Sequence, residues 1–430
     1  MKALERAVRR HVRLADGFPA GLLGGFRRIL GARWGGAVPV SRVFVDLSPL
    51  DTPSRFRGIG SYVANLGRAL SRLRPEERAG LSLYGLVRPS SRVAGEAVGS
   101  LCYTGDLTLR PGRLQYSRYL MRRRFAMNGL TRRLGAELLH LTEARGTPLG
   151  ERVPLIVTCH DLIPLIMHRE YLPRLPLMRS GQRALDRRRY RHAQRIIAIS
   201  ETTKRDLVRE LGMDADRIDV VYHGVDHERF DPHEREGERD RLRRKLGIER
   251  PYVLYVGGAD RRKDLKRLVR AYGLTRRAHD VDLVLAGSLP PWKRRALVAE
   301  ARGSGLLHRV RFLGYVPANL IAALYRHCSL HVFPSRYEGF GLPVLEAMAC
   351  GAPTITTGAT ALGEVAADAA RTFAPGSTEE LCEAMLALLD DGSLRVHYRN
   401  VGIARAAQFS WRRCALATIE SYQRALASRS

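Results

Sequence analysis

Two glutamates carry the clearest chemical signal in this sequence. Glu338 and Glu346 lie eight residues apart in the segment FPSRYEGFGLPVLEAMACG (333–351), which runs from an apolar strand through a glycine-containing turn into a helix. A carboxylate in the turn can accept hydrogen bonds from sugar hydroxyls, and one on the helix can accept them from a ribose diol. Glycine lets another backbone approach closely, and the first amides of a helix bind anions. The amides that we expect to be free at the start of this helix are those of Phe340, Gly341 and Leu342.

Two adjacent cations could serve the same chemistry. Arg262 and Lys263 follow the apolar segment 252–257, whose last residue, Gly257, opens the intervening turn. Cations at the carboxyl end of a strand can neutralise a leaving diphosphate without a metal ion. The alternative interpretation is an exposed basic turn that binds no ligand.

A histidine and a pair of glycines come from the first half of the chain. His160 begins the sequence HDLIP directly after the strand predicted at 154–159, so we expect it at the carboxyl end of that strand. Gly58 and Gly60 precede a predicted helix. They form a weak dinucleotide-binding fingerprint, because Val63 stands where a third glycine is needed. A histidine with a purely structural role is the alternative.

These residues need a scaffold that gathers strand ends, and the sequence predicts two such scaffolds. Short apolar runs alternate with helical patterns from 43 to 222 and again from 252 to 356, which is typical of parallel sheets in α/β domains. Ligands of such sheets bind beyond the carboxyl ends of the strands, so we expect a cleft between two doubly wound domains. Ser200 is expected to cap a helix and His223 to lie at the hinge. The predicted segments are a basic extension at 1–40, a first domain at 41–235, a linker at 236–250, a second domain at 251–405, and a C-terminal helix at 406–430 that packs back on the first domain.

The glutamate segment resembles the E-x7-E signature of glycosyltransferase family 4, the retaining nucleotide-sugar enzymes of the GT-B fold, and the likeness spans residues 43–410. Arg262 and Lys263 resemble the arginine–lysine pair of that family, and HDLIP resembles the same segment of mannosyl- and glucosyl-transferring relatives. The resemblance implies two Rossmann-like domains, of which the first binds the acceptor and the second the nucleotide sugar. It implies catalytic roles for His160, Arg262, Lys263 and Glu338, and donor binding by Gly58, Gly60, Gly257, Phe340, Gly341, Leu342 and Glu346.

The implied reaction moves a hexose, with mannose favoured, from a nucleotide diphosphate sugar to a glycan or lipid-linked glycan acceptor in surface polysaccharide biosynthesis. GDP-mannose is the favoured donor, UDP-glucose stays open, and no cofactor or metal is expected. Asp280 and Asp282 form a D-x-D pair, the metal motif of the other glycosyltransferase fold, but they precede a predicted strand instead of following one. A sugar-nucleotide epimerase of the same fold is the alternative enzyme.

Charge and composition bound the remaining choices. The 430 residues include 72 Lys and Arg against 43 Asp and Glu, a net charge of +29. Nucleic-acid binding is therefore an alternative from another class, supported mainly by the acid-free arginine run at 110–133. Residues 1–40 combine basic residues with apolar ones at helical spacing, which makes an anionic membrane surface a candidate partner. No apolar run reaches the 18 residues of a spanning helix, and six scattered cysteines indicate a reducing compartment, so we expect a cytoplasmic protein, peripheral at the inner face of the membrane if it binds there.

Overall fold

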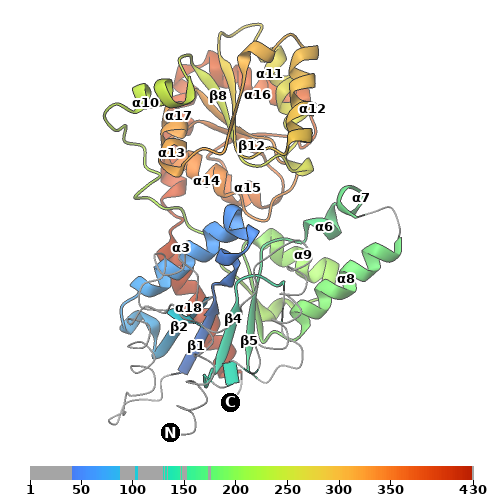
Figure 1. The fold of residues 1–430 in the computed structure, drawn as a ribbon, viewed down its shortest axis with the longest axis vertical. Coiled ribbons are helices and arrows are strands. Elements are labelled where there is room, and N and C mark those ends of the chain that lie inside the picture. The colour runs from blue at the N-terminus through green and yellow to red at the C-terminus, as the bar shows by residue number, and fades with distance from the viewer. Residues whose placement is uncertain are drawn as a thin grey trace, which may run out of the picture. The chain divides into compact units, whose positions relative to one another are not determined.

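The structure is a computed structural model that describes residues 41–87, 102–104, 129, 131–132, 134–145, 147, 153–172 and 176–428 (Figure 1). The extension at 1–40 and almost all of the arginine run at 110–133 lie outside the described residues, so the predictions made for them stay predictions. Among the helices that are described, none combines the length and apolar character needed to cross a bilayer.

The first half of the chain forms a parallel sheet in the order β3-β2-β1-β4-β5-β6-β7. All residues of its central strands β4 and β5 are buried, because helices cover both faces of a parallel sheet. The strands are β1 (Ser41–Asp46), β2 (Leu81–Val87), β3 (Cys102–Thr104), β4 (Leu138–Leu141), β5 (Leu155–Cys159), β6 (Arg195–Ala198) and β7 (Ile218–Val220). The helices of this part are α3 (Gly58–Arg72), α6 (Ile163–Ile166), α7 (His168–Tyr171), α8 (Pro176–Arg191) and α9 (Glu201–Leu211).

The second half forms a six-stranded parallel sheet in the order β10-β9-β8-β11-β12-β13. Its strands are β8 (Tyr252–Val256), β9 (Asp282–Ala286), β10 (Val310–Gly314), β11 (Leu330–Phe333), β12 (Thr354–Thr357) and β13 (Arg371–Phe373). The helices from the linker onward are α10 (Glu238–Leu246), α11 (Leu265–Thr275), α12 (Pro291–Gly303), α13 (Ala318–His327), α14 (Leu342–Ala349), α15 (Thr360–Ala366), α16 (Thr378–Asp390), α17 (Gly392–Ala406) and α18 (Trp411–Ala427). Two doubly wound α/β sheets are thus confirmed.

The sequence prediction was wrong in some details of these strands. The last strand of the first sheet, predicted at 220–222, ends at Val220. The three-residue edge strands β3 and β13 were not predicted, because a run of three residues is too short to show a period of two.

The C-terminal helix α18 belongs to the core of the first sheet, although it follows the second sheet in the chain (Figure 1). It contacts α3 and strands β4, β5 and β6, and it buries Trp411, Ile419 and Tyr422 there. Ser410 caps its first turn by accepting a hydrogen bond from the amide of Arg413. The helix that follows the second sheet therefore packs on the first sheet.

A buried chain of hydrogen bonds joins α18 to α3 through the first sheet. Tyr422 Oη lies 2.8 Å from Nδ1 of His140, whose Nε2 lies 2.8 Å from Thr158 Oγ1. Thr158 Oγ1 is in turn 3.0 Å from the hydroxyl of Tyr62. Burial lowers the pKa of His140 to about 3, so the ring is neutral and can donate at one nitrogen and accept at the other. Each side-chain polar atom in this series of hydrogen bonds therefore has a partner within the series.

We expect Tyr422→Phe to destabilise the protein, because it leaves one ring nitrogen of His140 buried without a partner. The cost should be about 1–3 kcal/mol, or a fall of about 2–10 °C in the melting temperature. Tyr315→Phe is the matched control, since that hydroxyl sits on a side chain that is 77% exposed. Equal melting temperatures of both variants and the parent would contradict this account of the buried chain.

Candidate functional site

Two loops meet at the carboxyl ends of neighbouring strands in the second sheet. Strands β8 and β11 are hydrogen-bonded neighbours, and both run in the same direction. The short 3-10 helix Arg261–Lys263 follows β8, and the loop that carries Glu338 follows β11. The amide of Arg336 donates to the carbonyl of Arg262 at 2.8 Å, which ties the two loops together. The carboxyl ends of adjacent parallel strands thus place three of the predicted residues in contact.

Glu338 is the centre of this contact. Its Oε1 lies 2.5 Å from Nζ of Lys263, and its Oε2 lies 3.3 Å from Nη2 of Arg262. Ser335 Oγ donates a third hydrogen bond, at 2.5 Å. Burial raises the pKa of Glu338, but the two cations outweigh it and the pKa falls below its ordinary value, so the side chain is a carboxylate. Glu338 is thus a single carboxylate paired with two cations.

The two cations are held in different ways. Lys263 is buried and its Nζ lies 4.3 Å from the centre of the Phe333 ring, a cation–π contact. Burial lowers the pKa of Lys263, which Glu338 opposes. Arg262 also contacts Asp260 at 3.1 Å, and Asp260 accepts a hydrogen bond from Tyr171 on α7. The sequence predicted two adjacent cations at this strand end, and the structure shows in addition that both pair with carboxylates.

His160 follows β5, as predicted. Its Nε2 lies 2.8 Å from the carbonyl of Thr142, and because a carbonyl can only accept, Nε2 carries the proton. Burial lowers the pKa of His160 to about 4, so the ring is neutral at pH 7 and Nδ1 is left as an acceptor. The ring of Tyr62 meets it edge to face, with centroids 5.0 Å apart.

Gly339 brings the Glu338 loop against His160. A Cβ on Gly339 would lie 1.9 Å from the carbonyl oxygen of His160, so only glycine allows this approach. Sequence reasoning did not single out Gly339, although it lies between Glu338 and Phe340 in the same glycine-containing turn. The contact joins a loop of the second sheet to the end of β5 in the first.

Helix α14 begins at Leu342, as predicted, and Gly341 precedes it with a φ of +117°. A Cβ on Gly341 would lie 2.6 Å from a methyl group of Leu362, so glycine is needed here for conformation and for space. The ring of Phe340 is buried against His223, with centroids 4.8 Å apart. The side chain of Phe340 therefore has a packing role, and only its amide is left to bind a ligand.

Glu346 lies on α14 and does not join the Glu338 cluster in the described structure. Its Oε2 accepts a hydrogen bond from Tyr325 at 3.3 Å. Burial raises the pKa of Glu346 to about 7, and it outweighs the opposing effects of the Tyr325 hydrogen bond and of Arg229. The carboxyl group is thus half protonated near neutrality, unlike that of Glu338.

The remaining predicted glycines have different surroundings. A Cβ on Gly60 would lie 2.4 Å from the backbone of Arg55, so close packing alone accounts for this glycine. Gly58 begins α3 and has open space around it. Gly257 has a φ of +152°, and its carbonyl oxygen would lie 2.0 Å from a Cβ on Gly287. Donor binding by these glycines stays a prediction.

Glu364 is a second residue that the sequence did not reveal. This side chain of α15 accepts hydrogen bonds from the amides of Glu201 and Thr202, at 2.8 and 2.6 Å. It therefore shares the first turn of α9 with Ser200, whose predicted capping role is confirmed by its bond from the amide of Thr203. No local pattern could pair residues more than 160 positions apart.

The D-x-D pair lies away from this site. Asp282 is the first residue of β9, so it lies at the amino ends of the strands, whereas Lys263 lies beyond their carboxyl ends. Both carboxylates are paired with arginines: Asp280 with Arg250, Arg276 and Arg309, and Asp282 with Arg309 and Arg311. Over the part of the chain that is described, no group of three or more His, Cys, Asp or Glu could hold a metal ion.

Comparison with known proteins gives the family. Residues 56–229 match the sequence model of Glycosyltransferase Family 4, and residues 238–405 match that of Glycosyl transferases group 1. The D-inositol 3-phosphate glycosyltransferase of Paenarthrobacter aurescens is 30% identical over 304 residues, which are 68% of this chain and 71% of that protein.

Two further matches widen the comparison. The serotype-specific mannosyltransferase WbdA of Escherichia coli is 30% identical over 279 residues, 64% of this chain, and the match spans only 34% of WbdA. Sucrose-phosphate synthase from Thermosynechococcus elongatus superposes with a TM-score of 0.73 at 22% identity, covering 90% of this chain and all of that one. The chain therefore belongs to glycosyltransferase family 4, the group 1 glycosyl transferases, and has the GT-B fold.

Proposed function

We propose that this protein transfers a hexose, with mannose favoured, from a nucleotide diphosphate sugar to a glycan or lipid-linked glycan acceptor in surface polysaccharide biosynthesis. The cluster of Glu338, Lys263 and Arg262 carries this proposal, because it places two cations at the strand ends where a diphosphate would lie. GDP-mannose is the favoured donor, on the sequence HDLIP and on the likeness to a mannosyltransferase of Escherichia coli.

In the proposed mechanism the protein stabilises the leaving group and orients the sugar. Lys263 and Arg262 offset the charge that develops on the departing diphosphate, and Glu338 fixes both cations in advance. Neutral His160 can accept a hydrogen bond at Nδ1 from a sugar hydroxyl. The acceptor hydroxyl attacks the anomeric carbon from the face that the diphosphate leaves and gives its proton to the departing phosphate oxygen, which retains the anomeric configuration without a protein nucleophile. Glu346 accepts hydrogen bonds from the hydroxyls of the ribose.

The first test is nucleotide protection in thermal melts of the full chain. GDP should raise the melting temperature more than UDP or ADP at equal concentration, because a ligand that binds only the folded state stabilises it by mass action. A larger shift with UDP would replace GDP-mannose by a uridine donor. No shift with any nucleoside diphosphate would contradict nucleotide-sugar transfer itself.

Donor affinity should depend on pH through Glu346. Its pKa of about 7 means that the carboxylate, the form that accepts both ribose hydroxyls, is lost as the pH falls through neutrality. The dissociation constant of the sugar nucleotide should therefore rise about tenfold from pH 8 to pH 6. At pH 8, Glu346→Gln should weaken binding by about 1.5–3 kcal/mol, and its affinity should vary little with pH.

Glu383→Gln is the control for this change, since Glu383 is exposed on α16. It should bind the sugar nucleotide as the parent does and keep the parent's pH dependence. Parent-like affinity and pH dependence in Glu346→Gln would remove the ribose role from Glu346.

Transfer should continue in excess EDTA. The proposed counter-charges of the diphosphate are Lys263, Arg262 and the amides at the start of α14, whereas the carboxylates of the D-x-D pair are taken by arginines. The initial rate with EDTA should equal the rate with added Mg²⁺ or Mn²⁺. Loss of activity in chelator that either cation restores would contradict metal independence and bring Asp280 and Asp282 back into consideration.

A further inference from the structure

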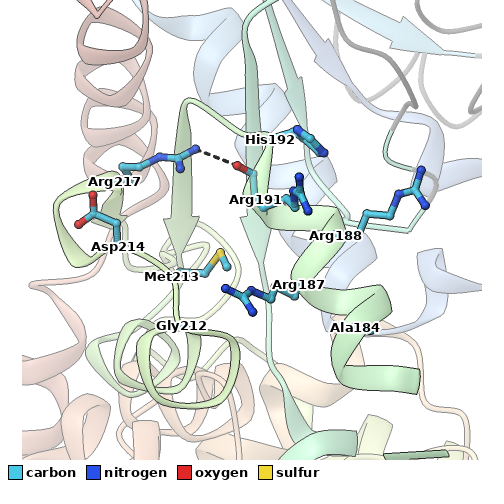
Figure 2. A pocket seen from close by; sticks show the side chains of 9 residues that line it. All are labelled: Ala184, Arg187, Arg188, Arg191, His192, Gly212, Met213, Asp214 and Arg217. Atoms are coloured by element: carbon cyan, nitrogen blue, oxygen red, sulfur yellow. Dashed lines mark hydrogen bonds between the residues drawn. The ribbon is translucent and has the colours of Figure 1, made fainter. Parts of the chain in front are cut away.

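A second basic site lies on the first sheet, at the end of α8. A pocket of about 730 Å³ lies between the last turns of α8 and the connection from α9 to β7, and Figure 2 shows its lining side chains. That volume is within the range of small-ligand sites, about 300–1,000 Å³. We call it the arginine pocket, after its lining residues Arg187, Arg188, Arg191 and Arg217.

Three of these arginines share one face of α8. With Ala184 they follow the spacing i, i+3, i+4 and i+7, so they stack along the helix above a small side chain. Like charges at this spacing destabilise a helix. All three are exposed, and in the described structure none of them forms an ion pair with a carboxylate, whereas neighbouring Arg189 pairs with Asp186 at 2.5 Å. The only acid of α8 therefore serves its other face.

The rest of the lining leaves the positive charge uncompensated. Arg217 donates to backbone carbonyls, including that of Arg191 at 3.2 Å (Figure 2). Asp214, the one acid among the described lining residues, accepts a hydrogen bond from the amide of Asp216 and caps the turn before β7. The pKa of His192 is lowered by burial and then by Arg191, Arg188 and Arg217, as expected in a positive field. The described lining thus contains four guanidinium groups and one carboxylate.

This pocket is separate from the Glu338 cluster. Its residues precede β6 and β7, which begin at Arg195 and Ile218. His160 instead follows β5, the parallel neighbour of β6. The pocket therefore lies at the amino ends of the strands and His160 at their carboxyl ends, on opposite sides of the same sheet. A bound sugar nucleotide cannot fill both sites.

We propose that the arginine pocket binds phosphate esters, as an anion site distinct from the donor site. Guanidinium forks bind phosphate oxygens in pairs, and the exposed stack on α8 supplies several forks on one wall. Among the described residues the lining contains no Phe, Tyr or Trp, so this part of the chain offers no platform there for stacking nucleic-acid bases. The phosphate can come from a lipid headgroup or from a soluble polyphosphate, and the experiment separates these two sources.

The deciding measurement is hydrogen–deuterium exchange on the full chain with tripolyphosphate as the probe. Residues 187–193 and 212–217 should become protected, and the signal at 338–346 reports any binding at the donor site separately. The double variant Arg187→Gln/Arg191→Gln should lose the first protection and keep the second. The control Arg295→Gln/Arg302→Gln removes the same charge from exposed positions of α12 that form no ion pair within the described residues, and it should behave as the parent.

Sedimentation with vesicles identifies the source of the phosphate. If the site takes lipid headgroups, the pocket variant should bind vesicles containing anionic phospholipid at least tenfold more weakly than the α12 control, and neither should bind neutral vesicles. Equal vesicle binding by both variants assigns the site to soluble phosphates. The proposal is overturned if tripolyphosphate does not protect residues 187–193 in the parent. It is also overturned if these residues are still protected in the Arg187→Gln/Arg191→Gln variant.

Discussion

A buried carboxylate between two cations is the constraint on which the site depends. Removing Glu338 from water is costly unless its charge is paired and its oxygens accept hydrogen bonds, and Lys263, Arg262 and Ser335 supply both. These partners come from the loops after β8 and β11. The site can therefore form only when those two strands are paired. It depends in turn on the apolar side chains that hold the strands together.

A group of stacked rings connects this cluster to the first sheet. His223, predicted only as a hinge residue, is buried between Tyr62 and Trp411, with ring centroids 4.7 and 5.6 Å away. Phe340 reaches the same group from the Glu338 loop. Tyr62 is itself fixed by the hydrogen bonds that run through Thr158 to α18. The C-terminal helix can thus influence His160 without touching a substrate, because it holds the ring against which His160 packs.

The sequence predicted what depends on local pattern and missed what depends on distant contacts. The alternation of strands and helices, the start of α14 and the cap at Ser200 follow from neighbours in the chain. The close approach of Gly339 to His160 and the capping of α9 by Glu364 do not, because their partners lie more than 160 residues away. The same limit explains why the pairing of Arg262 and Lys263 with Glu338 was not predicted: it needs β8 and β11 to be adjacent, which no motif states.

The arginines of the described chain differ in how they are paired, and this bears on how the net charge of +29 should be interpreted. In the second sheet, several arginines at strand and helix ends are neutralised, as Arg309 is by Asp280 and Asp282, and Arg326 by Glu238. On α8 the exposed face that carries Arg187 and Arg191 has no such acid. Arginines without an ion pair within the described residues also occur in the second half, as Arg295 and Arg302 do on α12. What distinguishes α8 is that Arg187, Arg188 and Arg191 share one face of the helix beside a pocket, where one ligand can contact several guanidinium groups.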